Sequence, residues 1–426
     1  MNTRRHNSSL ILSRDSDVLL QRCGDRWQIP CTLNNSHFWQ SAEPVNRAVR
    51  DCFGLDVITL RCLQVANDEA AQMVKSVYLQ RYLGGDLPGD MAWFARDDLP
   101  DGLAPGIQGW LATLDDPAHP AWYRLHWYET LAASVGTFDR LEQLRSWERS
   151  SVWRVVQNGE IRYLKTVPPM FTHEAPLTRW LGRRFPQNLP LVVDDTLLLM
   201  ADTGGAELAT RPEPSLWVDA MRRMGQIQRE LIPECETLAA LGVPLRPLSW
   251  IREHLAASLL DDSIYRIGDY PLTDDEAARL RAAVPRLTQQ VDEIAALNIP
   301  LTLEHGDLWH GQIVVRDGDF IFTDWSDATV THPFFSLEFF NAELANDLPD
   351  HPHAAAQATQ AYLRGWTAYA PLERLHAVYQ RSVLAVSPLY SALRYQHDIL
   401  PRMAQRWEMH NMVSYYLRHV LDALAD

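Results

Sequence analysis

The feature that most constrains this chain is a polar loop followed by a short hairpin and a second carboxylate. The loop reads His305-Gly306-Asp307-Leu308-Trp309-His310-Gly311-Gln312, and the apolar run Phe320-Ile321-Phe322 later leads to Asp324-Trp325. Between them, residues 316–319 (Arg-Asp-Gly-Asp) have the composition of a tight turn, so residues 312–322 are predicted to form a hairpin. We therefore expect Asp307 and Asp324 to flank one site.

The sequence around this loop is predicted to contain strands first and then mainly helices. Residues 143–156 and 161–165 are predicted to form strands joined by an Asn-Gly turn, and the second ends on Lys165. A helix is expected at residues 174–185, and two strands at residues 189–200 around Asp194-Asp195. Helical periodicity then marks residues 215–231, 273–297, 333–345, 354–369 and 402–424. A small strand-rich lobe therefore precedes a large helical lobe.

Residues 1–135 form a separate mixed segment. Strands are predicted at residues 8–12 and 17–21, and a helix at residues 44–53. Apolar or small side chains recur in this helix at three-and-four spacing, and Gly54 is well placed to end it. Residues 99–106 are rich in Pro and Gly and are expected to be a loop, and a helix at residues 119–133 leads out of the segment.

Size and charge exclude several classes of partner. A chain of 426 residues suits two or three domains rather than one core. The net charge of −15 argues against nucleic acid, whose phosphates require clustered Lys and Arg. The first residues lack a signal-peptide core, and no run is long enough to span a membrane, so we expect a cytoplasmic protein without a membrane partner. The oligomeric state stays open.

The cysteines do not form a recognisable framework. They are odd in number and lack C-x-x-C spacing, so we expect free thiols and neither structural zinc nor disulfides. The five are Cys23, Cys31, Cys52, Cys62 and Cys235.

The polar loop contains the residue types that phosphoryl transfer requires. That reaction needs a base for the hydroxyl, oxygen ligands for magnesium and a lysine for the nucleotide phosphates. The kinase template is H-R-D, four residues and then Asn, with a later metal-binding Asp. Here His305-Gly306-Asp307 is followed by four residues and Gln312, and Asp324 ends the next apolar strand.

On these residues the chain resembles the aminoglycoside phosphotransferase and choline kinase-like family of small-molecule kinases. The family pattern is HGD-x-H-x-x-N followed by an apolar strand ending in D-W or D-F, and HGDLWHGQ with the later FTDW is similar to it. The resemblance covers residues 138–426. It implies an α+β, bilobal, protein-kinase-like fold with a β-rich N-lobe at residues 136–203 and a helical C-lobe at residues 204–426.

The resemblance also implies roles for single residues. Asp307 would be the catalytic base, Asp324 the principal magnesium ligand, and Gln312 a second metal ligand. Lys165, on the third strand of the N-lobe, would meet the phosphates of ATP and pair with Glu174 on the following helix.

Two further segments are implied to contact the nucleotide. Met200 to Asp202 would be the hinge beside the adenine. Ser150 and Ser151 lie where the hairpin that covers the nucleotide would turn. The cofactors implied are therefore ATP and Mg²⁺.

The loop departs from the family pattern at two positions. Gln312 replaces Asn, and its extra methylene must be accommodated around a cation with strict octahedral geometry, so we expect weaker second-metal binding. Trp309 stands in place of the family's histidine and His310 comes next, with structural and catalytic roles equally open. Asp327 and His332 are assigned to structure, with Asp327 the better functional candidate.

The first segment carries a second resemblance. Arg47-Ala48-Val49-Arg50-Asp51-Cys52-Phe53-Gly54-Leu55 is similar to the second half of a Nudix box, R-E-U-x-E-E-x-G-U. The three glutamate positions hold Ala48, Asp51 and Cys52, so the metal ligands are largely lost. This resemblance implies a degenerate α/β Nudix-like domain at residues 1–135 without pyrophosphate hydrolysis, acting as a scaffold, a substrate lid or an interaction surface.

The leading hypothesis is a kinase that moves the γ-phosphate of ATP to a hydroxyl of a small molecule, namely an antibiotic, a sugar or an amino alcohol. The alternative is a nucleotide-binding pseudokinase with a regulatory or scaffold role, which the Gln312 departure motivates. Nudix-type hydrolysis by the first segment is a second alternative.

Overall fold

The computed structural model describes residues 5–15, 17–34, 38–68, 73–112, 114, 116–194 and 197–425. Its contacts divide the chain into two compact units: Met1–Pro168 with Thr196–Ala201, and Pro169–Asp195 with Asp202–Asp426. The chain passes between the units three times. The last passage lies between Ala201 and Asp202, inside the segment predicted as a hinge.

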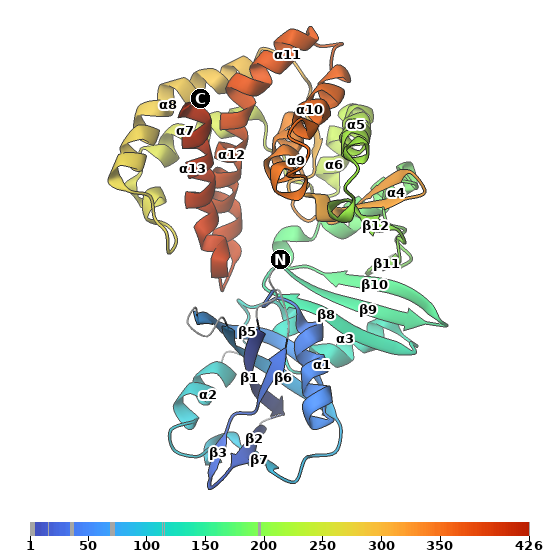
Figure 1. Cartoon of the computed structure of the whole chain (residues 1–426), viewed down its shortest axis with the longest axis vertical. Helices are drawn as coiled ribbons and strands as arrows, with labels where there is room; N and C mark the ends of the chain where they lie inside the picture. The colour runs from blue at the N-terminus through green and yellow to red at the C-terminus, as the bar shows by residue number, and fades with distance from the viewer. Residues whose placement is uncertain are drawn as a thin grey trace. The chain divides into compact units, whose positions relative to one another are not determined.

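A large sheet dominates the first unit (Figure 1). Its strands are β1 (Arg5–Arg14), β2 (Asp17–Cys23), β3 (Arg26–Gln28), β4 (Cys31–Asn34), β5 (Asp56–Asp68), β6 (Met73–Gly84) and β7 (Met91–Ala95). The order is β3-β2-β1-β6-β5, with β4 paired to β1 and β7 to β2. The β1–β6 pair is parallel and the β1–β2 pair antiparallel. The strands predicted at residues 8–12 and 17–21 are confirmed.

Three helices accompany this sheet: α1 (Ala42–Phe53), α2 (Ala104–Leu111) and α3 (Trp127–Val135). The prediction of α1 is confirmed, including its end at Gly54, whose N–H donates to the Arg50 carbonyl at 2.9 Å. The prediction of a loop at residues 99–106 is wrong at its C-terminal end. Pro105 lies in the first turn of α2, where proline is compatible with a helix. The helix expected at residues 119–133 begins only at Trp127, after a single 3-10 turn.

The first unit also contains a four-stranded antiparallel sheet of β8 (Arg140–Trp147), β9 (Ser150–Gln157), β10 (Glu160–Thr166) and β11 (Leu198–Ala201). Asn158 and Gly159 both have positive φ, so the predicted Asn-Gly turn is confirmed. Two expectations were wrong. Residues 143–156 belong to two strands, and only β11 forms in the described part of residues 189–200, with Asp195 outside the described residues.

The two sheets share one hydrophobic cluster. Ile11 and Leu60 of the large sheet pack in the same cluster as Trp153 and Leu164 of the small one. A buried amide also joins them, because Gln143 of β8 donates to the Thr59 carbonyl and accepts from the Thr59 N–H, both at 2.8 Å. The segment with the Nudix-like motif and the small sheet therefore form a single compact unit.

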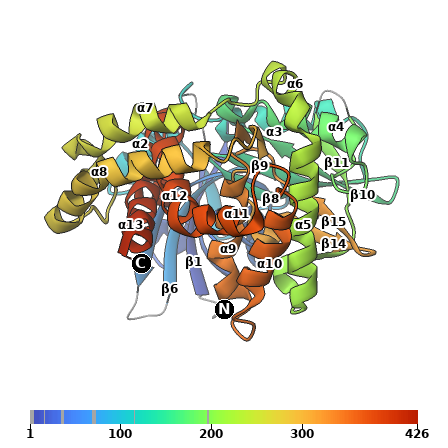
Figure 2. The same cartoon turned by 90° about the horizontal axis from the view of Figure 1, so that it is seen from above.

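The second unit is mainly helical (Figures 1 and 2). Its helices are α4 (Glu174–Arg184), α5 (Pro214–Glu230), α6 (Cys235–Ala240), α7 (Leu248–Leu259), α8 (Asp274–Ala295), α9 (Phe334–Asp347), α10 (Ala354–Arg364), α11 (Leu372–Val378), α12 (Leu384–Arg394) and α13 (Met412–Ala425). The helices α7, α8, α12 and α13 form one group, and α5, α9 and α10 form another. Among the described residues, no helix combines the length and the apolar character that a membrane span requires.

Most of these helices were predicted. Five expected helices match α4, α5, α8, α9 and α10, although α10 ends at Arg364 instead of residue 369. The last predicted helix starts ten residues late, at Met412. Helices α6, α7, α11 and α12 were not predicted.

Short strands place the polar loop within this unit. They are β12 (Ala206–Glu207), β13 (Thr302–Glu304), β14 (Ile313–Arg316), β15 (Asp319–Phe322) and β16 (Thr329–Thr331). The predicted hairpin is confirmed as β14–β15, and β13 pairs with β16. The polar loop therefore begins where β13 ends, and Asp324 follows β15 by two residues.

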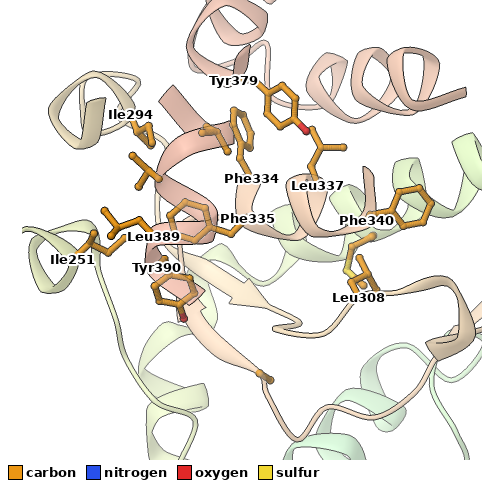
Figure 3. Packing of buried hydrophobic residues seen from close by; sticks show 14 of the residues in the cluster. Ile251, Ile294, Leu308, Phe334, Phe335, Leu337, Phe340, Tyr379, Leu389 and Tyr390 are labelled. Atoms are coloured by element: carbon orange, nitrogen blue, oxygen red, sulfur yellow. The ribbon is translucent and has the colours of Figure 1, made fainter. Parts of the chain in front are cut away.

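The core beneath these strands is built on α9 (Figure 3). Phe334, Phe335 and Phe340 of α9 are buried in one cluster with Leu389 of α12. Phe335 stacks on Tyr390 with ring centroids 5.0 Å apart. Leu308 of the polar loop belongs to the same cluster and is fully buried, so the loop is anchored in the core next to Asp307.

Candidate active site

Backbone hydrogen bonds tie the polar loop to the residue before Asp324. His305 Nε2 lies 2.9 Å from the Thr323 carbonyl oxygen. The Thr323 N–H donates to the Gln312 carbonyl at 2.9 Å. Both ends of the loop are thus joined to Thr323, so the structure brings Asp307, Gln312 and Asp324 together at one end of the β14–β15 hairpin. Both carboxylates are half-buried.

Gly306 determines the path of the loop. Its φ is +82°, and a Cβ atom built there would lie 2.1 Å from the Asp327 carbonyl oxygen. Its N–H donates to Glu304 Oε1 at 2.8 Å. Only glycine satisfies both the left-handed conformation and this close approach of backbone to backbone. The HGD motif therefore needs its glycine to place Asp307.

Asp324 has an unusual backbone. Its φ is +59°, in the left-handed region that residues with a Cβ rarely adopt. The hydroxyl of Ser326 donates to Asp324 Oδ1 at 2.7 Å. Such conformations are concentrated at functional sites, where the surrounding structure holds them.

The oxygen atoms at this site suit a hard divalent cation. Gln312 Oε1 accepts from the Thr323 hydroxyl at 3.3 Å, one residue from Asp324. Magnesium prefers such oxygen ligands and is often bound by one or two protein groups together with substrate phosphates and water. Among the described residues, no group of three or more His, Cys, Asp and Glu side chains could hold a metal. The residues present fit magnesium delivered with a nucleotide.

A buried ion pair lies behind the loop. Arg394 Nη2 of α12 donates to Asp327 Oδ1 at 2.6 Å, and the two side chains are only 6% and 5% exposed. Arg394 Nη1 also donates to the Gly306 carbonyl at 3.4 Å. Burial acts to lower the pKa of Arg394, but its interactions with Asp327 and with the nearby Tyr390, Glu304 and Tyr395 together outweigh burial and raise that pKa. Arg394 thus connects the Asp327 carboxylate to the backbone next to Asp307.

The sequence did not point to Arg394 or to Glu304. Asp327 had been singled out as a candidate, but its partner lies 67 residues further along the chain. Glu304 is buried, and burial raises the pKa of its carboxyl. Neither residue belongs to the HGD or DW motif. The only sequence signal for Glu304 was its position directly before the HGD motif.

The two histidines near the motif are structural. His310 is fully buried, with Nδ1 2.6 Å from Asp347 Oδ2 and Nε2 3.0 Å from the Phe340 carbonyl oxygen. Both ring nitrogens thus lie within hydrogen-bond distance of an oxygen atom of α9. His332 is buried and accepts from the Phe334 N–H at 3.3 Å, and burial lowers its pKa to about 3. His310 therefore fastens the loop to α9, and His332 fastens the start of α9.

Part of the predicted nucleotide site lies in the first unit. Lys165 is on β10, the third strand of the small sheet, and is buried. Met200 is on β11, opposite Tyr163.

The placement of Ser150 and Ser151 at a turn was wrong. The turn is Glu148-Arg149, and both serines lie in strand β9 and are buried. The indole N–H groups of Trp147 and Trp153 donate to their hydroxyls at 3.0 and 2.8 Å. The serine hydroxyls are thus engaged by neighbouring tryptophans.

The other predicted nucleotide residues lie in the second unit. Glu174 is the first residue of α4 and is buried. Asp202 is exposed, and its Oδ1 accepts from the Gly204 N–H at 3.1 Å. Because Lys165 and Glu174 belong to different units, their pairing stays a prediction.

No family model matches the sequence, and no curated protein matches it. Solved structures of small-molecule kinases are similar to it. A Plasmodium vivax ethanolamine kinase shares 14% identity over 71% of this chain and 86% of that chain, with a TM-score of 0.45. An amicoumacin kinase shares 13% over 74% and 96%, with a TM-score of 0.42. A thermostable aminoglycoside phosphotransferase mutant shares 16% over 70% and 98%, with a TM-score of 0.43. The chemistry of this chain is therefore inferred from the residues of its own site.

Proposed function

We propose that this chain is an ATP- and magnesium-dependent phosphotransferase that moves the γ-phosphate to a hydroxyl of a small molecule. One observation carries the proposal. The structure joins the HGD loop and the strand leading to Asp324 through Thr323, which bonds to His305 at one end of the loop and to Gln312 at the other. This arrangement supports a base and a metal ligand acting at one place.

Asp307 is the proposed catalytic base. It accepts the proton of the substrate hydroxyl, or orients that hydroxyl, while the oxygen attacks the γ-phosphate. Gly306 and the Arg394 hydrogen bond to its carbonyl fix the backbone that presents this carboxylate. The loop thus restricts the hydroxyl to one direction of approach, which is the main contribution of a protein to this reaction.

Asp324 and Gln312 are the proposed magnesium ligands. When bound, the cation neutralises charge on the nucleotide phosphates. Lys165 would add a second positive charge at those phosphates, with Glu174 orienting it, and residues 200–202 would contact the adenine. The acceptor is a small molecule with a free hydroxyl: an antibiotic, a sugar or an amino alcohol.

The proposal is tested by measuring ATP consumption against a panel of hydroxyl compounds from those three classes. The Asp307→Asn variant should lose turnover by a factor of about a hundred or more while still binding nucleotide. Asp319→Asn is the matched control, because Asp319 is an exposed aspartate on the β14–β15 hairpin that follows the loop. Full turnover by Asp307→Asn would contradict the assigned role.

A nucleotide-binding pseudokinase is the second candidate. The observation that favours it is Gln312, which stands where kinases have Asn and whose amide oxygen already accepts from the Thr323 hydroxyl. Nucleotide binding without turnover across the whole panel, by a protein whose Asp307 and Asp324 are intact, would favour this candidate over the enzyme.

The first segment is proposed to be a degenerate Nudix-like domain. In α1, Ala48 is buried where the motif has its first glutamate, and Asp51 is exposed. A single exposed carboxylate does not make the paired metal site that pyrophosphate hydrolysis requires. The full chain, incubated with magnesium and a nucleoside diphosphate sugar, should release no nucleoside monophosphate. Release would instead support hydrolysis by this segment.

A further inference from the structure

Three arginines converge on one surface pocket of the second unit. Arg222 and Arg229 come from α5 and Arg364 from α10, two helices that pack side by side (Figure 1). Ala361 and Gly365 complete the lining, and the volume is about 280 Å³. None of the described lining residues is acidic, in a chain whose net charge is −15. The pocket therefore concentrates positive charge against the overall charge of the protein.

Two of these guanidinium groups have no carboxylate partner among the described residues. Arg222 pairs with Asp219 on its own helix. Within the described part of the chain, neither Arg229 nor Arg364 forms an ion pair, and Arg229 lies over the Trp366 ring, 5.8 Å from its centroid. A planar guanidinium left without an acceptor beside a pocket is suited to a bidentate anion.

Gly365 leaves room for the Arg229 side chain. A Cβ atom at Gly365 would lie 2.0 Å from Arg229 Nη1, so any other side chain there would displace the guanidinium. Arg229 is half-buried. Partial burial restricts this side chain before an anion binds, which reduces the entropy lost on binding.

Helix dipoles account for only part of this arrangement. Arg229 and Arg364 lie in the last turns of α5 and α10, where a cation is favoured. That effect explains each arginine separately. It explains neither the acid-free pocket on which they converge nor the glycine that makes room for Arg229.

We propose that this pocket binds the phosphate group of a small molecule through charge-assisted hydrogen bonds from Arg229 and Arg364, with Arg222 at the rim. The ligand is free phosphate or a small phosphomonoester. Arginine forks match phosphate oxygens bidentately, which favours this class over a monovalent anion. The pocket shares no residue with the candidate active site, so the proposal does not depend on the proposed kinase activity.

The test is isothermal titration calorimetry of the full chain with inorganic phosphate and with glycerol phosphate, at an ionic strength held constant with sodium chloride. Saturable binding is expected for the wild type. Arg229→Gln and Arg364→Gln should each weaken it by about tenfold or more, the effect of one lost charge-assisted hydrogen bond. Because Arg364 is exposed, its variant should fold normally and decides the case if Arg229→Gln does not.

Two controls define the site. Arg279→Gln removes an exposed arginine from α8 and should leave binding unchanged. Arg374→Gln removes an exposed arginine from α11, outside the pocket, and should also leave binding unchanged. Binding of inorganic phosphate alone would identify the free ion as the ligand, and binding of both probes would identify a phosphomonoester. The proposal is overturned by the absence of saturable binding, or by equal affinity in the wild type and the Arg364→Gln variant.

Discussion

Replacing Arg394 by methionine tests the buried ion pair behind the HGD loop. The change removes the Arg394 guanidinium from Asp327, in a site where both side chains are at most 6% exposed. Breaking such a pair costs about 3–5 kcal/mol, because the remaining carboxylate loses a buried counter-ion. It also removes the donor to the Gly306 carbonyl, so turnover should fall together with stability.

The assay is urea unfolding of the full chain followed by near-ultraviolet circular dichroism. Arg252→Met is the matched control, since Arg252 pairs with Asp292 on the surface and the side chains are 57% and 47% exposed. That variant should lose less than about 1 kcal/mol. The Asp327→Asn/Arg394→Met double variant should recover much of the loss of the single variant, because it removes the buried carboxylate charge together with its counter-ion.

The reasoning is refuted if Arg394→Met is no less stable than Arg252→Met. It is also refuted if the double variant is as unstable as the single one. Either result would mean that water reaches Asp327 and that the pair does not hold the loop.

Three further outcomes follow from the same geometry. Gly306→Ala should abolish turnover and lower the free energy of unfolding in urea by about 1–3 kcal/mol, because the new Cβ atom would collide with the Asp327 carbonyl. Gly318→Ala is the control and should keep turnover, because there is open space around its Cβ position. His332 is neutral in the folded protein, since its pKa is about 3, whereas the unfolded chain takes up a proton below about pH 6.5. The stability that His332 contributes above that pH is therefore lost as the pH falls, by about 2 kcal/mol at pH 5 relative to pH 8. Urea unfolding at the two pH values should show a loss smaller by that amount in His332→Asn. Gln312→Asn should shorten the side chain and tighten magnesium binding, read as a lower magnesium concentration at half-maximal turnover; no change would mean that Gln312 does not touch the metal.

The elements that the sequence predicted are those with local signals. The three-and-four spacing that buries Val45 and Val49, together with Gly54, predicted α1 to within two residues. The turns at Asn158-Gly159 and Asp317-Gly318 require positive φ, a conformation that Asn, Asp and Gly adopt more readily than other residues. Local chemistry was sufficient in these places.

The misses have non-local causes. The partner of Asp327 lies on α12, and no local pattern connects the two positions. Helix α12 contains Pro388 and is flanked by π-helical segments, which disturb a regular helical period. Ser150 and Ser151 were placed at a turn by comparison with a nucleotide-covering hairpin, but they lie in β9, where Trp147 and Trp153 donate to their hydroxyls.

Asp307 and Asp324 are proposed to act in one metal-dependent site. Mn²⁺ binding, measured by electron paramagnetic resonance in the presence of a non-hydrolysable ATP analogue, separates their roles. Asp324→Asn should weaken the nucleotide-dependent Mn²⁺ affinity by about tenfold or more, while Asp307→Asn should keep that affinity and lose only turnover. Wild-type Mn²⁺ affinity in Asp324→Asn would contradict the account.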